Sequence, residues 1–200
     1  MMLVLTGLPT LFPKLVESRT YSERMFRVVF LKSLNDAESK EAILRPVESA
    51  NCPIHLEDDS VNAIVKMSGG YPYFLQFICR EVYDAFIQRI DKGQSTAVPV
   101  TEIEQKLDTD FFAGRWSRAT DRQRQLLSVV AKLKRADDEF TVQEIVELSS
   151  KILDKPFSSS HVNQMLATLT NQGLVFKNRH GKYSFAVPLL GRFILRQPSF

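Results

Sequence analysis

The basic side chains near the end of the chain are the residues whose type and spacing indicate chemistry most clearly. After Pro156 the sequence contains no Asp or Glu but five basic residues, namely Lys177, Arg179, Lys182, Arg192 and Arg196. Residues 1–117 hold 13 Lys and Arg against 16 Asp and Glu, whereas residues 118–200 hold 13 against 7. This asymmetry indicates an anionic partner for the C-terminal part, nucleic acid first. A basic surface that serves only solubility is the alternative.

The histidines and cysteines give no catalytic or metal-binding pattern. His55, His161 and His180 lie near no Ser/Asp or Cys constellation in the sequence, and their spacing is not that of metal ligands. Cys52 and Cys79 are too few for a disulfide framework, and Cys79 falls within an apolar helical pattern, as a small core residue does. We therefore expect no metal site and no catalytic residue in this chain alone.

Three helices and a β-hairpin are predicted to position the basic residues. Each helical pattern follows a candidate N-cap, at Thr120, at Thr141 and at one of Ser158 to Ser160. Residues 174–187 then alternate around a tip at Arg179, His180 and Gly181, which predicts a hairpin. This order, followed by a closing helix over 188–197, predicts a winged helix over residues 118–200.

A winged helix that binds DNA in the usual way places its third helix, about residues 160–172 here, in the major groove. The outward residues of that helix would meet base edges: His161, Asn163, Gln164 and Thr168. The basic residues of the hairpin would contact phosphates: Lys177, Arg179, His180 and Lys182.

The first part of the chain is predicted to hold two strands and then helices. The apolar run Leu3–Thr6 and the β-branched, aromatic run Phe26–Leu34 each indicate a strand. The helix that follows is capped by Asn35 or Asp36, and residues 91–100 have the composition of a loop or linker.

The stretch Met67–Val82 places two glycines and a proline between two helical patterns, of which the first has Ser60 as its expected N-cap. Gly69 suits a left-handed helix end, and Pro72 suits the start of the next helix, where its missing N–H is not needed. The local pattern therefore predicts a tight helix–helix corner.

Taken in this order, the segments resemble the C-terminal part of a P-loop ATPase of the AAA and STAND kind, close to the archaeal-type and origin-recognition-like ATPases. LVLTGLPTL resembles the strand and turn that carry a polar sensor residue, and Thr6 takes that position. YSERMFRVVFLKSL resembles the segment before the last core strand, with Arg24 as arginine-finger candidate and Arg27 second. GGYPYFLQ resembles a glycine–x–proline motif whose proline approaches adenine, which implies a cofactor contact at Gly70, Tyr71 and Pro72.

The resemblance implies a mainly α fold with minor β. It consists of a two-strand remnant of the ATPase core at 1–34, a helical lid at 35–112 and a winged-helix domain at 118–200. The sequence contains no G-x-x-x-x-G-K-[ST] loop and no apolar strand ending in Asp-Asp or Asp-Glu. We therefore expect a fragment that does not hydrolyse ATP alone, and ATP or ADP with magnesium only in the complete protein.

Two functions follow from these patterns and stay open. The first is a nucleotide-responsive, DNA-binding lid and winged helix; the second is a protein-interaction or autoinhibitory winged helix of a STAND signalling ATPase. The expected partners are DNA, the rest of the ATPase core or a second copy, with self-association through residues 2–34 because apolar strand edges recruit partners. No apolar run approaches the ~20 residues that cross a bilayer. No signal peptide is evident, and a cytoplasmic location without a membrane partner is expected.

Overall fold

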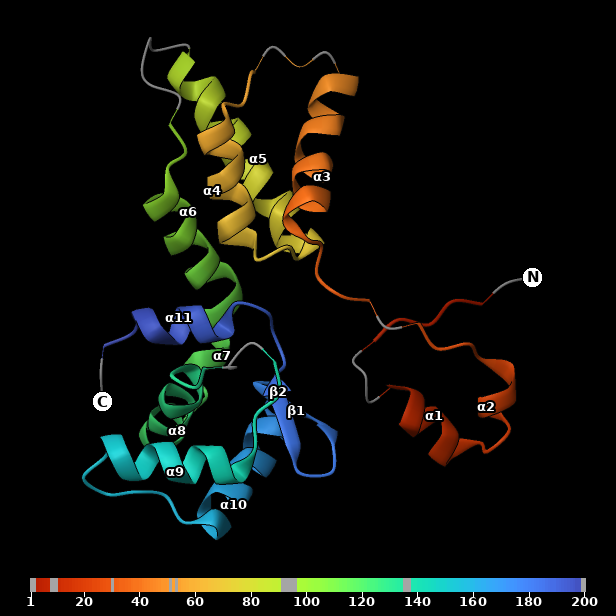
Figure 1. The fold of residues 1–200 in the computed structure, drawn as a ribbon, viewed down its shortest axis with the longest axis vertical. Helices are drawn as coiled ribbons and strands as arrows, with labels where there is room; N and C mark the ends of the chain where they lie inside the picture. Colours follow the sequence, from red (N-terminus) through yellow and green to blue (C-terminus); the bar gives the residue numbers. More distant parts are fainter. Residues whose placement is uncertain are drawn as a thin grey trace. The chain divides into compact units, whose positions relative to one another are not determined.

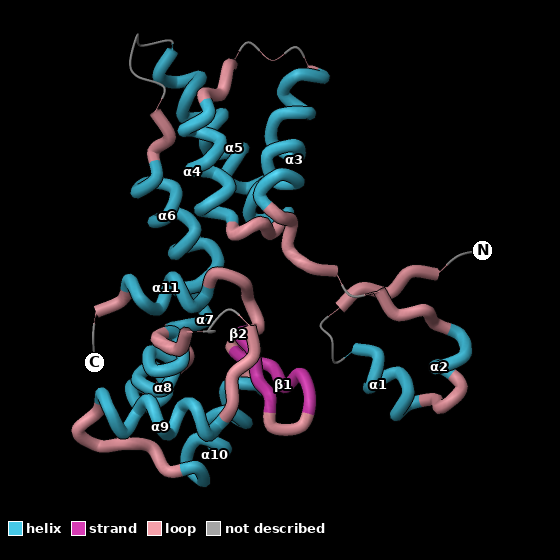
Figure 2. The backbone as a smooth tube through the Cα atoms, viewed as in Figure 1, coloured by secondary structure: helices cyan, strands magenta, loops and turns pink. Residues whose placement is uncertain are grey.

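A computed structural model describes residues 3–7, 11–29, 31–50, 52, 54–90, 97–134 and 138–198. The chain is mainly helical with a small two-stranded antiparallel sheet, which confirms the predicted mainly α fold with minor β (Figures 1 and 2). It divides into two compact units, one formed by Lys32–Gly114 and the other by Arg115–Phe200 together with Met1–Leu31. Each unit is described by itself.

The unit Lys32–Gly114 is helical throughout its described elements. These are α3 (Asp36–Ser49), α4 (Asp58–Ser68), α5 (Pro72–Ile90), α6 (Val100–Leu107) and a π-helical segment η1 (Asp108–Ala113). Helix α5 is the centre, because α3, α4 and α6 all pack against it. Its buried residues are Phe74, Leu75, Ile78, Val82 and Phe86. These residues repeat at helical spacing and so form one apolar face of α5.

Two helix starts in this unit differ in how well the sequence located them. Asn35 caps α3 through a capping box: its side chain accepts from the Glu38 N–H at 2.9 Å, and the Glu38 carboxylate accepts from the Asn35 N–H at 2.8 Å. The prediction of Ser60 as the cap of α4 was wrong, since α4 begins at Asp58 after Glu57 and Ser60 lies buried in its first turn. Acidic residues at 57–59 extend the helix toward its N-terminus because they favour the positive end of the helix dipole.

The segment Arg115–Phe200 contains three helices and a hairpin in the predicted order. Its described elements are α8 (Asp121–Ala131), α9 (Val142–Ile152), α10 (Ser159–Asn171), β1 (Val175–Arg179), β2 (Lys182–Phe185) and α11 (Leu190–Arg196), after the short α7 (Gly114–Trp116). Helices α8, α9 and α10 pack against one another, α10 packs against β1, and α11 packs across α8. The core is apolar, with Leu126, Leu127, Ile145, Leu166, Leu169 and Leu190 fully buried. Capping boxes at Thr120 and Thr141 and a side-chain cap at Ser158 confirm the predicted helix starts.

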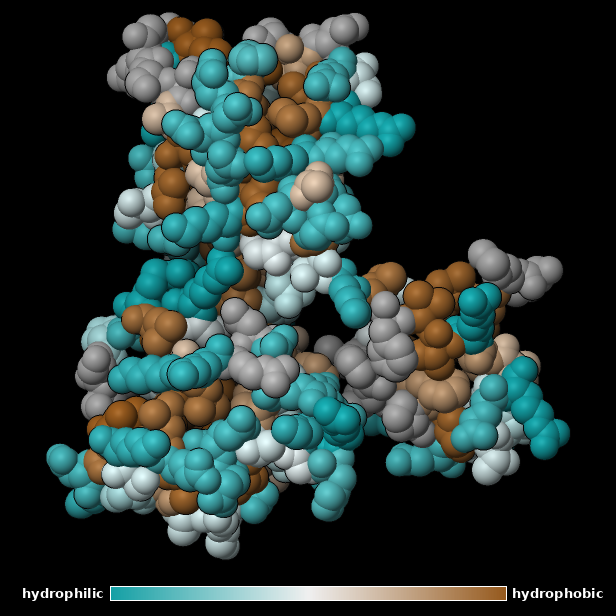
Figure 3. Space-filling model, viewed as in Figure 1, coloured by the Kyte–Doolittle hydropathy of each residue, from teal (hydrophilic) through white to brown (hydrophobic). Residues whose placement is uncertain are grey.

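The predicted strands in the N-terminal segment were wrong. Residues 3–7, 26–29 and 31–35 have no strand structure, and the described elements there are the short helices α1 (Leu11–Ser18) and α2 (Ser22–Met25). An extended apolar run becomes a strand only when another strand pairs with it, and the described sheet contains only β1 and β2. Their apolar side chains are exposed instead: Leu3 by 61%, Val29 by 70% and Leu31 by 91%. Figure 3 shows this brown surface over the N-terminal segment.

Candidate nucleic-acid interface

Helix α10 presents one apolar and one polar face. Val162, Met165, Leu166 and Leu169 are buried, whereas the four residues expected to face outward are all exposed: His161, Asn163, Gln164 and Thr168. The split follows from the 3.6-residue period, which puts positions 162, 165, 166 and 169 on one side of the helix. The outward face carries hydrogen-bonding groups and no carboxylate.

Two of the exposed side chains of α10 are hydrogen-bonded to their own helix. Asn163 Nδ2 donates to the Ser159 carbonyl at 2.9 Å, and Thr168 Oγ1 donates to the Gln164 carbonyl at 3.2 Å. The His161 ring stands edge-on to Phe157, with 6.1 Å between ring centroids. These weak local bonds leave the amide oxygen of Asn163 and the Gln164 amide as groups with which α10 can contact a partner.

The hairpin formed by residues 175–185 turns at His180 and Gly181, where Gly181 has a φ of +72° that suits glycine. Lys177, Arg179 and His180 are exposed, and Lys182 is half-buried. The pairing runs from Val175 opposite Phe185 to Lys177 opposite Tyr183, and its register shifts before Arg179. A shift of this kind is a β-bulge, which re-aims the side chains at the end of a strand.

A carboxylate from outside the hairpin meets Arg179. Arg179 Nη2 donates to Glu139 Oε2 at 2.8 Å, and Asn178 Nδ2 donates to Glu139 Oε1 at 3.2 Å. The hydrogen bond from Arg179 is the main cause that lowers the pKa of Glu139, with smaller contributions from Asn178 and Lys182. Arg179, one of the four hairpin residues expected to contact phosphates, is therefore paired with a carboxylate of the same chain. Sequence reasoning missed the pair because its partners are 40 residues apart.

Two other arginines counted as basic surface serve packing within Arg115–Phe200. Arg122 Nη2 donates to the Lys155 carbonyl at 2.9 Å, and the Arg122 guanidinium carbon lies 3.9 Å from the centroid of the Phe157 ring. Arg124 donates to the Trp116 carbonyl at 3.3 Å and pairs with Asp121 at 3.5 Å. The charge count alone thus overstated the number of cations available to a partner.

The glycine–proline corner in the unit Lys32–Gly114 has a local structural explanation. Gly69 ends α4 with a φ of 59°, and Gly70 follows with a φ of +75°. The Leu34 N–H donates to the Gly70 carbonyl at 2.8 Å, and a Cβ on Gly70 would lie 2.1 Å from the Leu34 carbonyl oxygen. The predicted helix–helix corner is confirmed, and both glycines are explained without a ligand.

The other residues carried over from the ATPase resemblance have these positions. Pro72 is exposed at the start of α5 and Tyr71 is half-buried before it. Thr6 and Arg24 are exposed in the N-terminal segment, outside the unit that contains Gly70, as is Arg27. The sequence holds no phosphate-binding loop to accompany them, so the residues present do not fit a complete nucleotide site and we derive no nucleotide step from them.

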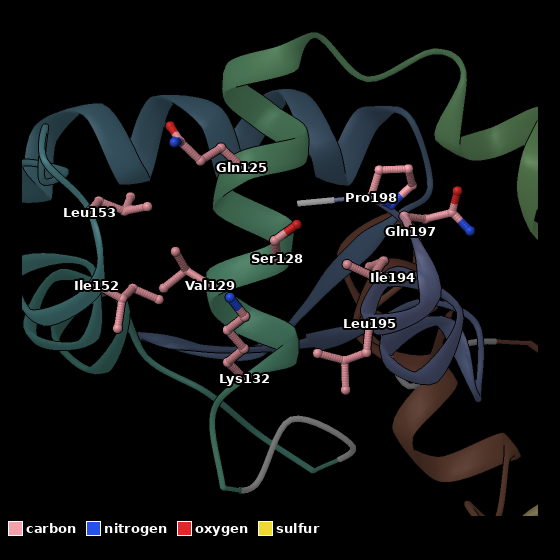
Figure 4. A pocket seen from close by; sticks show the side chains of 10 residues that line it. All are labelled: Gln125, Ser128, Val129, Lys132, Ile152, Leu153, Ile194, Leu195, Gln197 and Pro198. Carbon is pink, nitrogen blue, oxygen red and sulfur yellow. The ribbon is translucent and has the colours of Figure 1, made fainter. Parts of the chain in front are cut away.

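A groove lies on another part of Arg115–Phe200, between α8, the end of α9 and α11 (Figure 4). Its lining is mostly apolar and contains one charged side chain, Lys132. Ile152 and Leu195 stand at its sides with 42% and 55% of their surface exposed. All ten lining residues lie within residues 125–132, 152–153 and 194–198, so the groove is separate from the outward face of α10 and from the hairpin.

The Cys79 thiol lies partly buried within α5. Burial raises the pKa of the Cys79 thiol from 9.0 to about 11, which suppresses the reactive thiolate. Among the residues that the structure describes, no three His, Cys, Asp or Glu side chains are grouped as metal ligands would be.

A comparison with protein families finds a match for the C-terminal part of the chain. Residues 109–194 match the family described as "Domain of unknown function (DUF8462)". The match covers α8, α9, α10, the hairpin and most of α11, which is less than half of the 200 residues. No curated protein matches the chain. Within the described ranges, none of the helices combines the length and apolarity that crossing a membrane requires.

Proposed function

We propose that this chain is the lid and winged-helix region of an AAA/STAND-type P-loop ATPase and that residues 118–200 bind duplex DNA. The observation that carries the DNA part is the carboxylate-free polar face of α10, packed next to a hairpin that exposes Lys177 and Arg179. A helix with such a face suits the major groove, where side chains meet base edges, and a basic hairpin suits the phosphates beside it.

The chemistry of each group fits its proposed partner. Asn163 and Gln164 carry amides, which pair with adenine in the major groove, and His161 and Thr168 add further hydrogen-bonding groups. Lys177, Arg179, His180 and Lys182 offer donors to phosphate oxygens, which position a protein on a duplex without reading its sequence.

The ATPase part rests on the order of the sequence motifs. In the complete protein Gly70, Tyr71 and Pro72 would contact the adenine of ATP or ADP, Thr6 would be the sensor, and Arg24 the arginine finger. The chain alone is proposed to lack ATPase activity, since the phosphate loop and the magnesium carboxylate are not in its sequence.

The DNA part is tested by the salt dependence of binding. Fluorescence anisotropy of the full chain with a labelled duplex, repeated between about 50 and 200 mM salt, should show log K falling linearly with log[salt]. Neutralising the hairpin with K177Q, R179Q and K182Q together should reduce the magnitude of the slope by up to about 3, at ~0.9 per phosphate contact. The matched control is K132Q, K134Q and K151Q, which removes the same charge from α9 and the end of α8 and its following turn.

The alternative function is a protein-interaction or autoinhibitory winged helix. The pairing of Arg179 with Glu139 favours it, because it neutralises a cation that DNA binding would use. Binding that ignores salt, or a hairpin triple variant that binds as tightly as the control triple variant, would reject DNA binding and leave this alternative.

A further inference from the structure

Glu139 is an acidic residue whose carboxylate contacts the proposed DNA-binding hairpin. The residues next to it in the sequence do not predict this contact. We infer that Glu139 lowers the affinity of the hairpin for the nucleic-acid backbone, because its carboxylate already accepts from Nη2 of Arg179, one of the donors that a phosphate would use. The inference rests on the proposed duplex binding and names the residue that limits it.

The backbone on both sides of Glu139 is held by hydrogen bonds to β2. Phe140, the next residue, is 1% exposed and bridges to Tyr183 of β2 through two backbone bonds of 2.8 and 2.9 Å. Ser184 Oγ donates to the Asp138 carbonyl at 2.7 Å, on the other side of Glu139. The residues on both sides of Glu139 are therefore hydrogen-bonded to β2. These bonds fix the backbone from which the Glu139 side chain extends.

On the hairpin, Asn178 and Arg179 both donate hydrogen bonds to the Glu139 carboxylate. Asn178 lies between the two shifted registers, and its Nδ2 donates to both Glu139 Oε1 at 3.2 Å and Ser184 Oγ at 2.7 Å. With Asn178 and Arg179 on one carboxylate, both Glu139 oxygens accept from the hairpin. A phosphate presents the same kind of oxygen acceptors to an arginine, so the carboxylate and the phosphate compete for one site.

Because the Arg179–Glu139 pair is exposed to solvent, we expect a phosphate to displace the carboxylate only in part. The Arg179 side chain is 70% exposed and that of Glu139 30%, so solvent and a duplex both reach the guanidinium. Exposed ion pairs contribute little to stability, and a phosphate can displace this one at small cost. Glu139 would then weaken backbone binding without abolishing it, which leaves more of the recognition to the face of α10.

The test is a double-mutant cycle on duplex binding by the full chain. Glu139→Gln keeps the size of the side chain and removes its charge, so we expect binding about 2- to 5-fold tighter at 0.1 M salt, the range of an exposed pair. The slope of log K against log[salt] should steepen by part of the ~0.9 that one phosphate contact contributes, because Glu139 weakens the contact of Arg179 in the parent chain. The control is Glu147→Gln, which removes the same charge from α9, where Glu147 accepts from Gln143 at 2.9 Å.

The second arm of the cycle removes Arg179. In an Arg179→Gln background, Glu139→Gln should give no more gain than Glu147→Gln, because the competing guanidinium is no longer there. A full gain in that background would overturn the inference. A gain in the parent background no larger than that of Glu147→Gln would overturn it as well, while leaving the proposed DNA binding intact.

Two further results separate the inference from the function it rests on. If neither the parent chain nor Glu139→Gln binds the duplex at any salt, both the proposed function and the inference fail. If only Glu139→Gln binds, the parent chain does not bind DNA and Glu139 abolishes the contact instead of weakening it, so both are overturned as stated. Should Glu139→Gln lose helical circular dichroism, Glu139→Asp replaces it, because its shorter side chain draws the carboxylate back from Arg179 and should give a gain of the same sign.

Discussion

At Gly70 both the backbone conformation and a close neighbour restrict which residue types the position accepts. Its φ of +75° disfavours other residue types, and a Cβ there would lie 2.1 Å from the Leu34 carbonyl oxygen. Gly70→Ala should therefore cost more than the ~1–2 kcal/mol of backbone strain alone, because Leu34 must also move. Amide hydrogen exchange of α4 and α5 measures the loss as faster exchange of protected amides.

The matched control for this prediction is Gly173→Ala. Gly173 has a similar φ of +70°, and an added Cβ there meets nothing within 4 Å. This variant should show the backbone strain without the clash, in the exchange of α10 and β1. Equal losses of protection in the two variants would contradict the role given to Leu34.

Interactions between near neighbours in the sequence were predictable, and those between distant residues were not. The caps at Asn35, Thr120 and Thr141 each involve a residue three positions ahead, so the sequence displays both partners. The Arg179–Glu139 pair depends on a bridge between Phe140 and Tyr183, which only the folded chain creates. For the candidate site, the exposed face of α10 followed from helical period, whereas the pairing of Arg179 did not.

At the scale of elements, the contact made by Arg122 joins the start of α8 to the segment before α10. Besides its bond to Lys155 and its stacking on Phe157, Arg122 donates to Gln125, and the Phe157 N–H donates to Ser149 Oγ of α9 at 3.1 Å. Phe157 is only 2% exposed. Helices α8 and α9 and the segment before α10 are therefore joined through Phe157.

Arg122→Ala should destabilise Arg115–Phe200 by about 1–2 kcal/mol, from a charge-assisted bond and a cation–π contact. Hydrogen exchange should accelerate first at residues 153–161, where α10 begins. Arg118→Ala is the control, since Arg118 is an exposed arginine just before α8. A loss spread evenly over α8, α9 and α10, or matched by Arg118→Ala, would show that Arg122 has no special part in fixing α10.

Local sequence pattern was sufficient to predict some elements and not others. Helices α8, α9 and α10 carry their own caps and apolar faces, so local pattern was sufficient to find them. Leu3–Thr6 and Phe26–Leu34 have the composition of strands, but a strand also needs a hydrogen-bonding neighbour, which composition does not supply. The strand predictions were wrong because they did not take into account whether another strand is present to pair with these residues.

At the scale of the whole molecule, the N-terminal segment exposes several large apolar side chains. Val4 is 67% exposed, Met25 67% and Val29 70%, together with Leu3 and Leu31. Apolar area costs about 25 cal/mol per Å² when left in water, so covering these side chains is favourable. Extended apolar backbone without ladder partners is also a template for pairing with another chain.

We therefore expect the chain to self-associate through residues 2–34 when no other partner is present. Light scattering of the full chain should give a mass that rises with concentration, whereas a chain beginning at Lys32 should stay monomeric. Starting at Lys32 keeps the bond from Leu34 to Gly70 and the capping box of Asn35, so the unit Lys32–Gly114 retains its contacts. Val4→Asp with Val29→Asp in the full chain is the second variant, and it should also reduce the mass because like charges oppose strand pairing. A full chain that remains monomeric at high concentration, with residues 3–7 and 26–29 protected from hydrogen exchange, would show that these runs satisfy each other within one molecule.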